Sequence, residues 1–161
     1  MVELSVRSMT KVEYERWRSE IDRRFADSQV AAGTWQPERA LELARQGNDT
    51  LLPEGLATDG SLLLIAERPD GTPVGRLWIG LTHPRGTVDC AFLYDIEVRA
   101  EHRGRGYGRA LLAAAEAAVR ERGISALELN VFGDNQTAIA LYAGSGYAVV
   151  TQQMRKDLTA G

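Results

Sequence analysis

A glycine turn flanked by arginines is the part of this sequence best suited to chemistry. It follows an apolar stretch that ends in Ile96-Glu97-Val98, and it reads Arg103-Gly104-Arg105-Gly106-Tyr107-Gly108-Arg109 before a helix-like segment. We expect its three glycines to adopt positive φ and to let the backbone come close to a ligand. The first N–H groups of a helix have no partner within it, and its positive dipole end favours anions. The turn therefore predicts a phosphate site, with the arginines adding positive charge.

Other interpretations of the turn remain open at this stage. It could simply connect a strand to a helix tightly, with its arginines in solvent. It is not a Walker loop, because no Gly-Lys-Ser/Thr sequence follows it. It also does not suit a dinucleotide site, because it comes late in the chain, after several expected antiparallel strands, and not in an opening βαβ unit.

A second segment downstream makes the pattern more specific. It runs Asn130-Val131-Phe132-Gly133-Asp134-Asn135 and continues with Ala138, Leu141-Tyr142 and Gly146-Tyr147. The turn, written Arg103-x-x-Gly106-x-Gly108, resembles the pyrophosphate signature of the GNAT superfamily of N-acetyltransferases. The downstream segment resembles the second motif of that superfamily, in which an asparagine and a tyrosine flank the pantetheine arm of the cofactor. The two motifs span Phe92 to Tyr147.

The resemblance implies acetyl-CoA as the co-substrate, with no metal. It implies that the pyrophosphate is held by the backbone amides of Arg103, Gly104, Arg105, Gly106, Tyr107, Gly108 and Arg109. The main chain of Ile96 and Val98 would pair with the pantetheine amides in the manner of a strand. Asn135 would contact the cofactor arm, and Tyr142 would donate a proton to the departing thiolate.

The implied role of Tyr142 is chemically sound. Attack of a neutral amine on a thioester expels a thiolate, and a phenol within hydrogen-bond reach can protonate it. The thioester oxygen gains negative charge in the same step, and the Val98 N–H is the candidate donor to it. The alternative is that Tyr142, at helical spacing from Ala138, belongs to the core. Asn135 could equally cap its helix, which is compatible with cofactor contact.

The base that removes a proton from the amine is the open part of the mechanism. Some members of the superfamily use a carboxylate five residues before the motif asparagine, but that position here is Asn130, and an amide is no base. Asp95 and Glu97 offer carboxylates instead, and their spacing in a strand puts them on one face. The alternatives are an ion pair with an arginine for Asp95 and an exposed strand-end charge for Glu97.

The function predicted is an N-acetyltransferase that moves an acetyl group from acetyl-CoA to a primary amine by direct attack. The alternative is a non-catalytic acyl-CoA-binding or regulatory module that keeps the fold and the glycine turn. A nucleotide-binding protein without acetyl transfer is a third option, which would make the second motif coincidental.

The acceptor site is the least specified feature. In this superfamily it is usually built from the first two helices and the strand that faces them, which here means roughly residues 17–54. Trp35, Trp78, Glu20 and Asp22 are candidate contributors, since aromatic rings with nearby carboxylates suit a cationic amine. Trp17 and Trp78 are equally compatible with the core. A small-molecule amine and a peptide amine are both left open.

The fold class expected is a mixed α/β domain over residues 1–161. The resemblance implies the GNAT fold, a mostly antiparallel central sheet of about six or seven strands with about four helices and the cofactor between two central strands. Strands are expected at 2–7, 61–67, 73–81, 90–98, 126–131, 147–150 and 152–156. Helices are expected after Thr10, at 37–47, after the glycine turn as far as Gly123, and at 135–145, with a loop at 48–59.

Composition limits the remaining classes of protein. The 161 residues are 44 % hydrophobic and 25 % charged with a net charge of −3, which is ordinary for a globular protein. The charges are interspersed, so no nucleic-acid or membrane surface is indicated. Cys90 is the only cysteine, and with two histidines no zinc-ligand spacing is present. We expect a reduced, soluble, cytoplasmic protein, and leave open a homodimer formed through terminal strands or helices.

Overall fold

The structure is a computed structural model that describes residues 2–159. In chain order its strands and α-helices are β1 (Ser5–Ser8), α1 (Lys11–Ala31), α2 (Pro37–Leu51), β2 (Ser61–Glu67), β3 (Pro73–Gly80), β4 (Cys90–Val98), α3 (Tyr107–Arg120), β5 (Ala126–Leu129) and α4 (Gln136–Gly144). Short 3-10 turns lie at Gly55–Ala57 and Ala100–His102.

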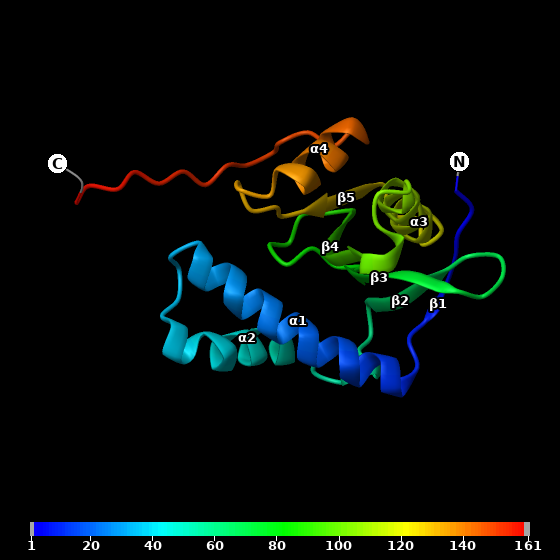
Figure 1. The fold of residues 1–161 in the computed structure, drawn as a ribbon, viewed down its shortest axis with the longest axis horizontal. Coiled ribbons are helices and arrows are strands. Elements are labelled where there is room, and N and C mark those ends of the chain that lie inside the picture. The colour runs from blue at the N-terminus through cyan, green and yellow to red at the C-terminus, as the bar shows by residue number, and fades with distance from the viewer. Residues whose placement is uncertain (1, 160–161) are drawn as a thin grey trace.

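One sheet organises these elements. Its strand order is β1-β2-β3-β4-β5, antiparallel throughout except for the parallel pair of β4 and β5. The helices α1 and α2 lie on one side of the sheet, and α3 and α4 lie on the other (Figure 1). The mixed α/β class, the mostly antiparallel sheet and the four helices are therefore as predicted, although the described sheet has five strands.

The two closing strands predicted at 147–150 and 152–156 are wrong. After Gly146, whose φ is +92°, the described chain leaves the sheet and runs extended and exposed past the end of α1 (Figure 1). The apolar pattern of this segment suits a strand, but a strand needs a partner, and β5 keeps its outer edge unpaired within residues 2–159.

A separate apolar cluster on each face of the sheet holds the helices of that face in place. Under α3 the cluster includes Leu77, Ile79 and Leu112, none of them more than 1 % exposed. On the opposite face Trp17 of α1 packs edge-on against Trp78 of β3 with ring centroids 5.4 Å apart. These contacts hold α1 and α3 on the two faces of β3.

A capping box holds the start of α1. The Glu13 N–H donates to the Thr10 hydroxyl at 3.2 Å, and the Thr10 N–H donates to the Glu13 carboxylate at 2.9 Å. Arg7 of β1 donates two hydrogen bonds to the same carboxylate, at 2.7 and 3.0 Å. The cap therefore also ties the helix to the edge strand.

The predicted end of the second helix at Gly47 is wrong, because α2 continues to Leu51. Ala40, Ala44 and Asn48 recur every fourth residue and are all buried against α1. Asn48 donates a 2.7 Å hydrogen bond to the buried Asp22 of α1. This packing outweighs the cost of about 1 kcal/mol for a glycine inside a helix.

The remaining boundaries differ little from those expected. The first strand begins at Ser5 and not at Val2, β5 ends at Leu129 and not at Val131, and α4 begins one residue after Asn135. Within residues 2–159, no helix has the length and apolarity needed to cross a membrane.

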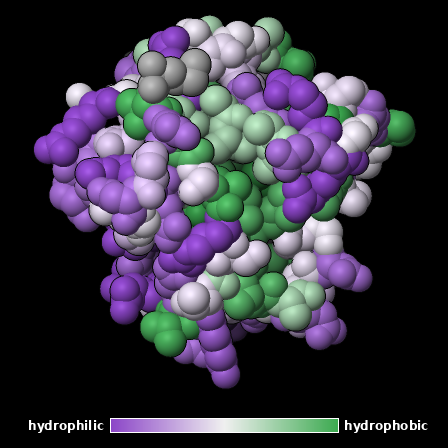
Figure 2. Space-filling model, turned by 90° about the vertical axis from the view of Figure 1, so that its right-hand side faces the viewer, coloured by the Kyte–Doolittle hydropathy of each residue, from purple (hydrophilic) through white to green (hydrophobic). Residues whose placement is uncertain are grey.

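The surface of the molecule is not uniformly polar. On the side where the N-terminus lies, Figure 2 shows apolar residues gathered in a central band with hydrophilic residues on both sides of it. Individual large apolar side chains are also exposed elsewhere, among them Val88 at 89 % and Met154 at 88 %.

Candidate active site

The site begins where β4 and β5 part. The two strands pair in parallel only from Cys90 to Leu93 of β4, opposite Ala126 to Leu129. An extra residue in β4 at Tyr94 interrupts the register with β3 at the same point, so the strand bends there. From Tyr94 to Val98 the edge of β4 that should face β5 has no strand beside it, because β5 pairs only with the first part of β4.

The backbone groups on this open edge can be assigned from the β3–β4 ladder. The Arg99 N–H donates to the Val74 carbonyl of β3 at 2.8 Å, and amides alternate in direction along a strand. Ile96 and Val98 therefore direct their N–H groups away from β3, toward the gap that β5 leaves. These are the two residues predicted to pair with pantetheine amides, and their backbone has the direction that this pairing requires.

The glycine turn meets the open edge at the start of α3. Gly104 and Gly106 have φ of +74° and +83°, which glycine adopts without strain. Gly106 is the N-cap residue of α3 and offers no side chain to the helix, so the first α3 amides remain uncapped. A helix N-terminus of this kind favours an anion.

Gly108 differs from the expectation of positive φ. It lies in the first turn of α3 with ordinary helical backbone, and a Cβ placed on it would be 3.4 Å from the Leu141 side chain. Its lack of a side chain therefore lets α3 approach α4. The turn needs glycine here for packing between the helices, not for backbone conformation.

The arginines of the turn have different surroundings. Arg103 donates to the Val98 carbonyl at 3.1 Å and to Glu97 at 3.0 Å, so it joins the turn to the end of β4. Arg105 and Arg109 are exposed and form no ion pair among the residues that the structure describes. Their charges remain available to a phosphate.

The residues of the second motif lie on and before α4. The Asn135 side chain accepts the Ala138 N–H at 3.2 Å, so Asn135 caps the helix, which was one of its two predicted roles. Tyr142 is partly buried against the cluster under α3, with its ring 5.9 Å from that of Tyr147. Burial, helped by the negative charge of Asp95, raises the pKa of Tyr142 above its ordinary value. Tyr142 is therefore protonated near neutral pH, as a proton donor must be.

Tyr147 has a partner that the sequence did not indicate. Its hydroxyl donates to Glu116 of α3 at 3.0 Å. Burial, the nearby carboxylate and this hydrogen bond all raise the pKa of Tyr147. The bond anchors the end of α4 to α3 and thereby fixes the helix that carries Tyr142.

Asp95 and Glu97 do share a face of β4, as predicted, but their environments differ. The Asp95 side chain is only 5 % exposed and accepts hydrogen bonds from Trp17 Nε1 at 2.9 Å and Arg76 Nε at 3.2 Å. Arg24 of α1 lies 3.6 Å away as a further ion-pair partner. These contacts fully explain a buried carboxylate in structural terms.

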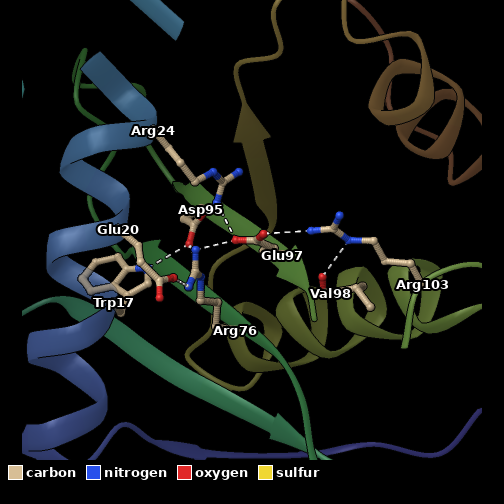
Figure 3. Close-up of polar contacts among 8 residues, drawn as sticks. All are labelled: Trp17, Glu20, Arg24, Arg76, Asp95, Glu97, Val98 and Arg103. Carbon is tan, nitrogen blue, oxygen red and sulfur yellow. Dashed lines mark hydrogen bonds and ion pairs between the residues drawn. The ribbon is translucent and has the colours of Figure 1, made fainter. Parts of the chain in front are cut away.

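Glu97 is the more accessible carboxylate, with 23 % of its side chain exposed. One of its oxygens accepts from Arg24 at 2.5 Å and from Arg76, and the other accepts from Arg103. Figure 3 shows these guanidinium groups converging on Glu97 from α1, β3 and the glycine turn. No sequence pattern indicated Arg24 or Arg76, because only the pairing of β3 with β4 and the placement of α1 bring them here.

A groove opens beside Glu97 along α1. It measures about 230 Å³ and is lined by Ser19, Glu20, Arg23, Arg24, Asp27 and Glu97. A larger hollow of about 450 Å³ between α1 and α2 shares Arg23 and Asp27 with it. Of the predicted acceptor contributors, only Glu20 lines the groove, where it pairs with Arg76 at 2.5 Å.

The other predicted acceptor residues have structural positions. Trp78 is 3 % exposed, and Asp22 is buried with Asn48 and Arg18. Trp35 packs on Phe25 with ring centroids 5.1 Å apart, at the far end of the two helices. Trp17 is 2 % exposed and belongs to the core, the alternative interpretation.

A group of possible metal ligands lies at the start of β4. The ligand atoms of His83, Cys90 and Glu128 are all within 4.8 Å of one another, a proximity that chain spacing did not indicate. The Arg85 N–H donates to His83 Nδ1 at 3.0 Å, which places the proton of a neutral ring on Nε2, facing Glu128 at 3.0 Å. Burial raises the pKa of the Cys90 thiol. The arrangement is that of a hydrogen-bonded cluster, in which a metal would have to displace the Nε2 proton.

Comparison with known proteins identifies the family. The model of the acetyltransferase (GNAT) family matches residues 14–147, which include both motifs and the open edge of β4. The chain belongs to the GNAT family of acetyltransferases. The resemblance found in the two motifs is thus confirmed, and the catalytic interpretation is favoured over the non-catalytic module.

Individual GNAT proteins support this placement. The uncharacterized N-acetyltransferase YycN of Bacillus subtilis is 37 % identical over 93 % of this chain and 97 % of its own length. Its crystal structure matches with a TM-score of 0.88 over 97 % of this chain and 99 % of that one. A mycothiol acetyltransferase of Propionibacterium freudenreichii is 32 % identical over 75 % of this chain but only 38 % of its own length.

A more distant structure shares the fold. AAC(6')-Iy, solved in complex with the bisubstrate analog CoA-S-monomethyl-acetylneamine, matches with a TM-score of 0.62 at 18 % identity over 96 % of this chain and 97 % of that one. At this identity the likeness establishes the GNAT fold alone.

Proposed function

We propose that this protein transfers the acetyl group of acetyl-CoA to a primary amine by direct attack of the amine nitrogen. The observation that carries the proposal is the open edge of β4 from Tyr94 to Val98, which leads to the uncapped start of α3. A ligand with amides at one end and a pyrophosphate at the other fits this continuous surface. Acetyl-CoA has both, and a nucleotide without pantetheine would leave the β4 edge unused.

The cofactor half of the proposal rests on backbone groups. The amides of residues 103–109 at the helix start would hold the pyrophosphate, with Arg105 and Arg109 adding charge. The N–H groups of Ile96 and Val98 would pair with pantetheine in the manner of an added strand. Asn135 would contact the arm while capping α4. The CoA analog bound by the distant AAC(6')-Iy is consistent with this placement in the shared fold.

The chemical half assigns roles on either side of the β4 edge. Glu97 accepts a proton from the substrate ammonium, directly or through a water, and leaves the neutral nitrogen free to attack the thioester carbonyl. The Val98 N–H stabilises the negative charge on the carbonyl oxygen. Tyr142 gives its proton to the departing thiolate as the carbon–sulfur bond breaks. The acetylated nitrogen loses its remaining extra proton to solvent, and solvent reprotonates Tyr142. Asp95 is assigned a positioning role, because its side chain is only 5 % exposed and does not line the groove.

The acceptor is proposed to enter along the groove beside Glu97. Its mixed lining of Glu20, Asp27, Arg23 and Arg24 suits a polar amine, either a small molecule or the amine of a peptide. The ammonium group of the acceptor would replace one arginine as the ion-pair partner of Glu97, so the Glu97 carboxylate would remain paired. The adjoining hollow between α1 and α2 offers room for the rest of a larger acceptor.

An amine panel tests the proposal. Purified protein would be incubated with acetyl-CoA and separate classes of amine: monoamines, amino acids, an aminoglycoside, and peptides with a free N-terminus or a lysine. Release of free CoA thiol would be followed together with the mass of the product, because a gain of one acetyl group distinguishes transfer from hydrolysis. Adenine nucleotides lacking pantetheine serve as the binding control.

The expected result is thiol release with at least one amine class, and tighter binding of acetyl-CoA than of the truncated nucleotides. Binding of acetyl-CoA with no release for any amine class would favour the non-catalytic module. Equal affinity for the truncated nucleotides would contradict the assignment of the β4 edge to pantetheine.

A further inference from the structure

The hollow between α1 and α2 differs in lining from the groove beside Glu97. Its volume of about 450 Å³ lies within the range of small-molecule sites, and its only charged lining residues are Arg23 and Asp27. The rest of the lining is apolar and consists of Ala26, Val30, Ala31, Pro37, Ala40 and Leu41. Such a surface favours a hydrocarbon group over a charged group, because an unpaired charge is costly to take out of water.

Small side chains create the hollow. The helices α1 and α2 run side by side (Figure 1), and their buried contact is formed by Ala26, Ala40 and Ala44. Around this contact Phe25 and Trp35 pack edge-on, with ring centroids 5.1 Å apart. Alanines leave space between two helices that larger side chains would fill. The hollow is therefore built into the packed helix pair.

Arg23 and Asp27 join the hollow to the groove, since both residues line both spaces. They lie one helical turn apart on α1 and thus on the same face of the helix. Neither forms an ion pair with another residue that the structure describes, whereas the neighbouring Arg24 pairs with Glu97. An acceptor with its nitrogen at Glu97 can therefore extend past Arg23 and Asp27 into the hollow without breaking a contact of the fold.

The spacing along α1 limits the length of such an acceptor. Arg24 marks the contact with Glu97, and Ala31 is the last residue of α1 in the lining of the hollow. With a rise of about 1.5 Å per residue, Ala31 lies about 10 Å farther along the helix than Arg24. Given carbon–carbon bonds of about 1.5 Å, a chain of about four carbon atoms would enter the hollow and one of about eight would reach its end.

We infer, on the basis of the proposed function, that the acceptor is an amphiphilic monoamine, whose single ammonium group meets Glu97 in the groove and whose hydrocarbon chain or ring fills the hollow. Polyamines and aminoglycosides fit less well, because they bring further ammonium groups to an apolar lining and to Arg23 and Arg24. A free alkylamine and the N-terminal amine of a peptide with an apolar side chain share this chemistry.

Calorimetry in the presence of CoA measures acceptor binding without turnover. The probes are n-butylamine, n-hexylamine and n-octylamine, and affinity should rise by up to about fourfold per added methylene, because each added methylene is buried in the hollow. The matched probe 1,6-diaminohexane has the length of hexylamine but a second charge. It should bind at least about tenfold more weakly than hexylamine, and equal binding would overturn the inference.

The variant A31F tests whether the hollow holds the chain. Ala31 is exposed at the end of α1, so a phenyl ring there should occupy the hollow without disturbing the core. A31F should lose the gain in affinity of octylamine over butylamine and keep the affinity for butylamine. A113F, at an exposed alanine of α3 on the other face of the sheet, is the matched control and should keep the full gain. An undiminished gain in A31F overturns the inference.

Thiol release from acetyl-CoA separates this inference from the proposed function. Turnover with a kcat/KM that does not depend on chain length would support acetyl transfer and overturn the amphiphilic acceptor. Affinity that rises with chain length and is lost in A31F, without thiol release, would support the hollow as a binding site and contradict acetyl transfer. A C-terminally amidated peptide that begins with glycine and leucine distinguishes the two sources, because the better substrate of this peptide and octylamine identifies which one supplies the hydrocarbon group.

Discussion

At the scale of single residues, the most informative pair is Asp95 and Glu97. Both are carboxylates on the same face of β4, and their sequence positions make them equal candidates for the base. Both carboxylates lie beside Arg24 and Arg76, but the structure separates them by exposure. Asp95 is buried and accepts the Trp17 indole N–H, whereas Glu97 reaches the groove and also pairs with the exposed Arg103. A base must reach the substrate, so its greater exposure is the reason for proposing Glu97.

This difference predicts opposite effects for two neutral substitutions. E97Q should lower kcat by about 10²–10⁴-fold, the usual contribution of a general base, with little loss of stability. D95N should lower the free energy of unfolding by about 1–3 kcal/mol, because it weakens a buried charged hydrogen-bond network. Steady-state kinetics on the amine found in the panel and urea unfolding would measure the two effects. The reverse pattern, with D95N folded normally but inactive, would transfer the base to Asp95.

Tyr142 gives a second test at this scale. Y142F should lower kcat by about 10²-fold or more while leaving the affinity for acetyl-CoA nearly unchanged, because only the proton donated to the thiolate is removed. Since burial raises the pKa of Tyr142 above its ordinary value, the phenol keeps its proton near neutral pH, and wild-type activity should not fall there through loss of this proton. Kinetics and calorimetry would give the two quantities. Y14F, at a tyrosine of α1 with no proposed role in the site, is the control. Wild-type turnover in Y142F would exclude the acid role.

At the scale of elements, the start of α3 is the part whose backbone conformation the proposed function requires. The turn places uncapped amides beside β4 only because Gly106 adopts a left-handed conformation. The same backbone conformation recurs at Gly123, just beyond the other end of α3, where φ is +75°. The two glycines therefore allow strain and function to be separated.

G106A and G123A should cost similar stability, about 1 kcal/mol each, because alanine at positive φ is strained in both places. Of these two variants, only G106A should abolish binding of acetyl-CoA in calorimetry, because only G106A displaces the amides proposed to hold pyrophosphate. G108V should also abolish binding, because its side chain would push Leu141 and move α4 away from α3. Unchanged affinity in G106A would contradict the pyrophosphate assignment.

The capping box of α1 makes a prediction about pH. The hydrogen bonds from Arg7 lower the pKa of Glu13 from 4.5 to about 2. A carboxylate whose pKa is lower in the folded state stabilises the fold above 4.5, and this contribution is lost as the pH falls from 4.5 toward 2. E13Q should therefore cost up to about 1 kcal/mol at neutral pH and progressively less below pH 4.5. Denaturant unfolding at several pH values, with the exposed E15Q as control, would measure it.

At the scale of the whole molecule, a buried polar contact joins α1 to the sheet. Trp17 of α1 donates across the apolar cluster to Asp95 of β4, which holds the helix that lines the groove against the strand that carries Glu97. The shape of the groove therefore depends on the position of α1 relative to β4, and not on either element alone.

W17F should remove this donor while it keeps an aromatic ring at the site. We expect the free energy of unfolding to fall by about 1–3 kcal/mol, because a buried carboxylate loses one of its partners. W35F, at a tryptophan that packs on Phe25 outside this network, should cost less. Urea unfolding of both variants would provide the comparison. A smaller loss in W17F than in W35F would show that the contact does not join the layers.

The site could be predicted from the sequence wherever its chemistry depends on local backbone. Residues near one another in the chain set the positive φ of Gly104 and Gly106. They also set the helix caps at Thr10 and Asn135 and the spacing that places Tyr142 on α4. For the same reason most helix and strand boundaries were predicted to within a few residues. Gly47 was the exception, because the packing of α2 on α1 outweighed its local preference.

Tertiary structure decided what depends on distant segments meeting. The sequence by itself determined the mixed α/β class, the glycine turn before α3 and two candidate carboxylates, because these follow from local conformation and residue type. Only the fold brought Arg24 and Arg76 to Glu97, buried Asp95 beneath Trp17, and opened β4 where β5 ends. It also left residues 147–156 without a strand to pair with, because a strand is completed by a neighbour that no local pattern supplies.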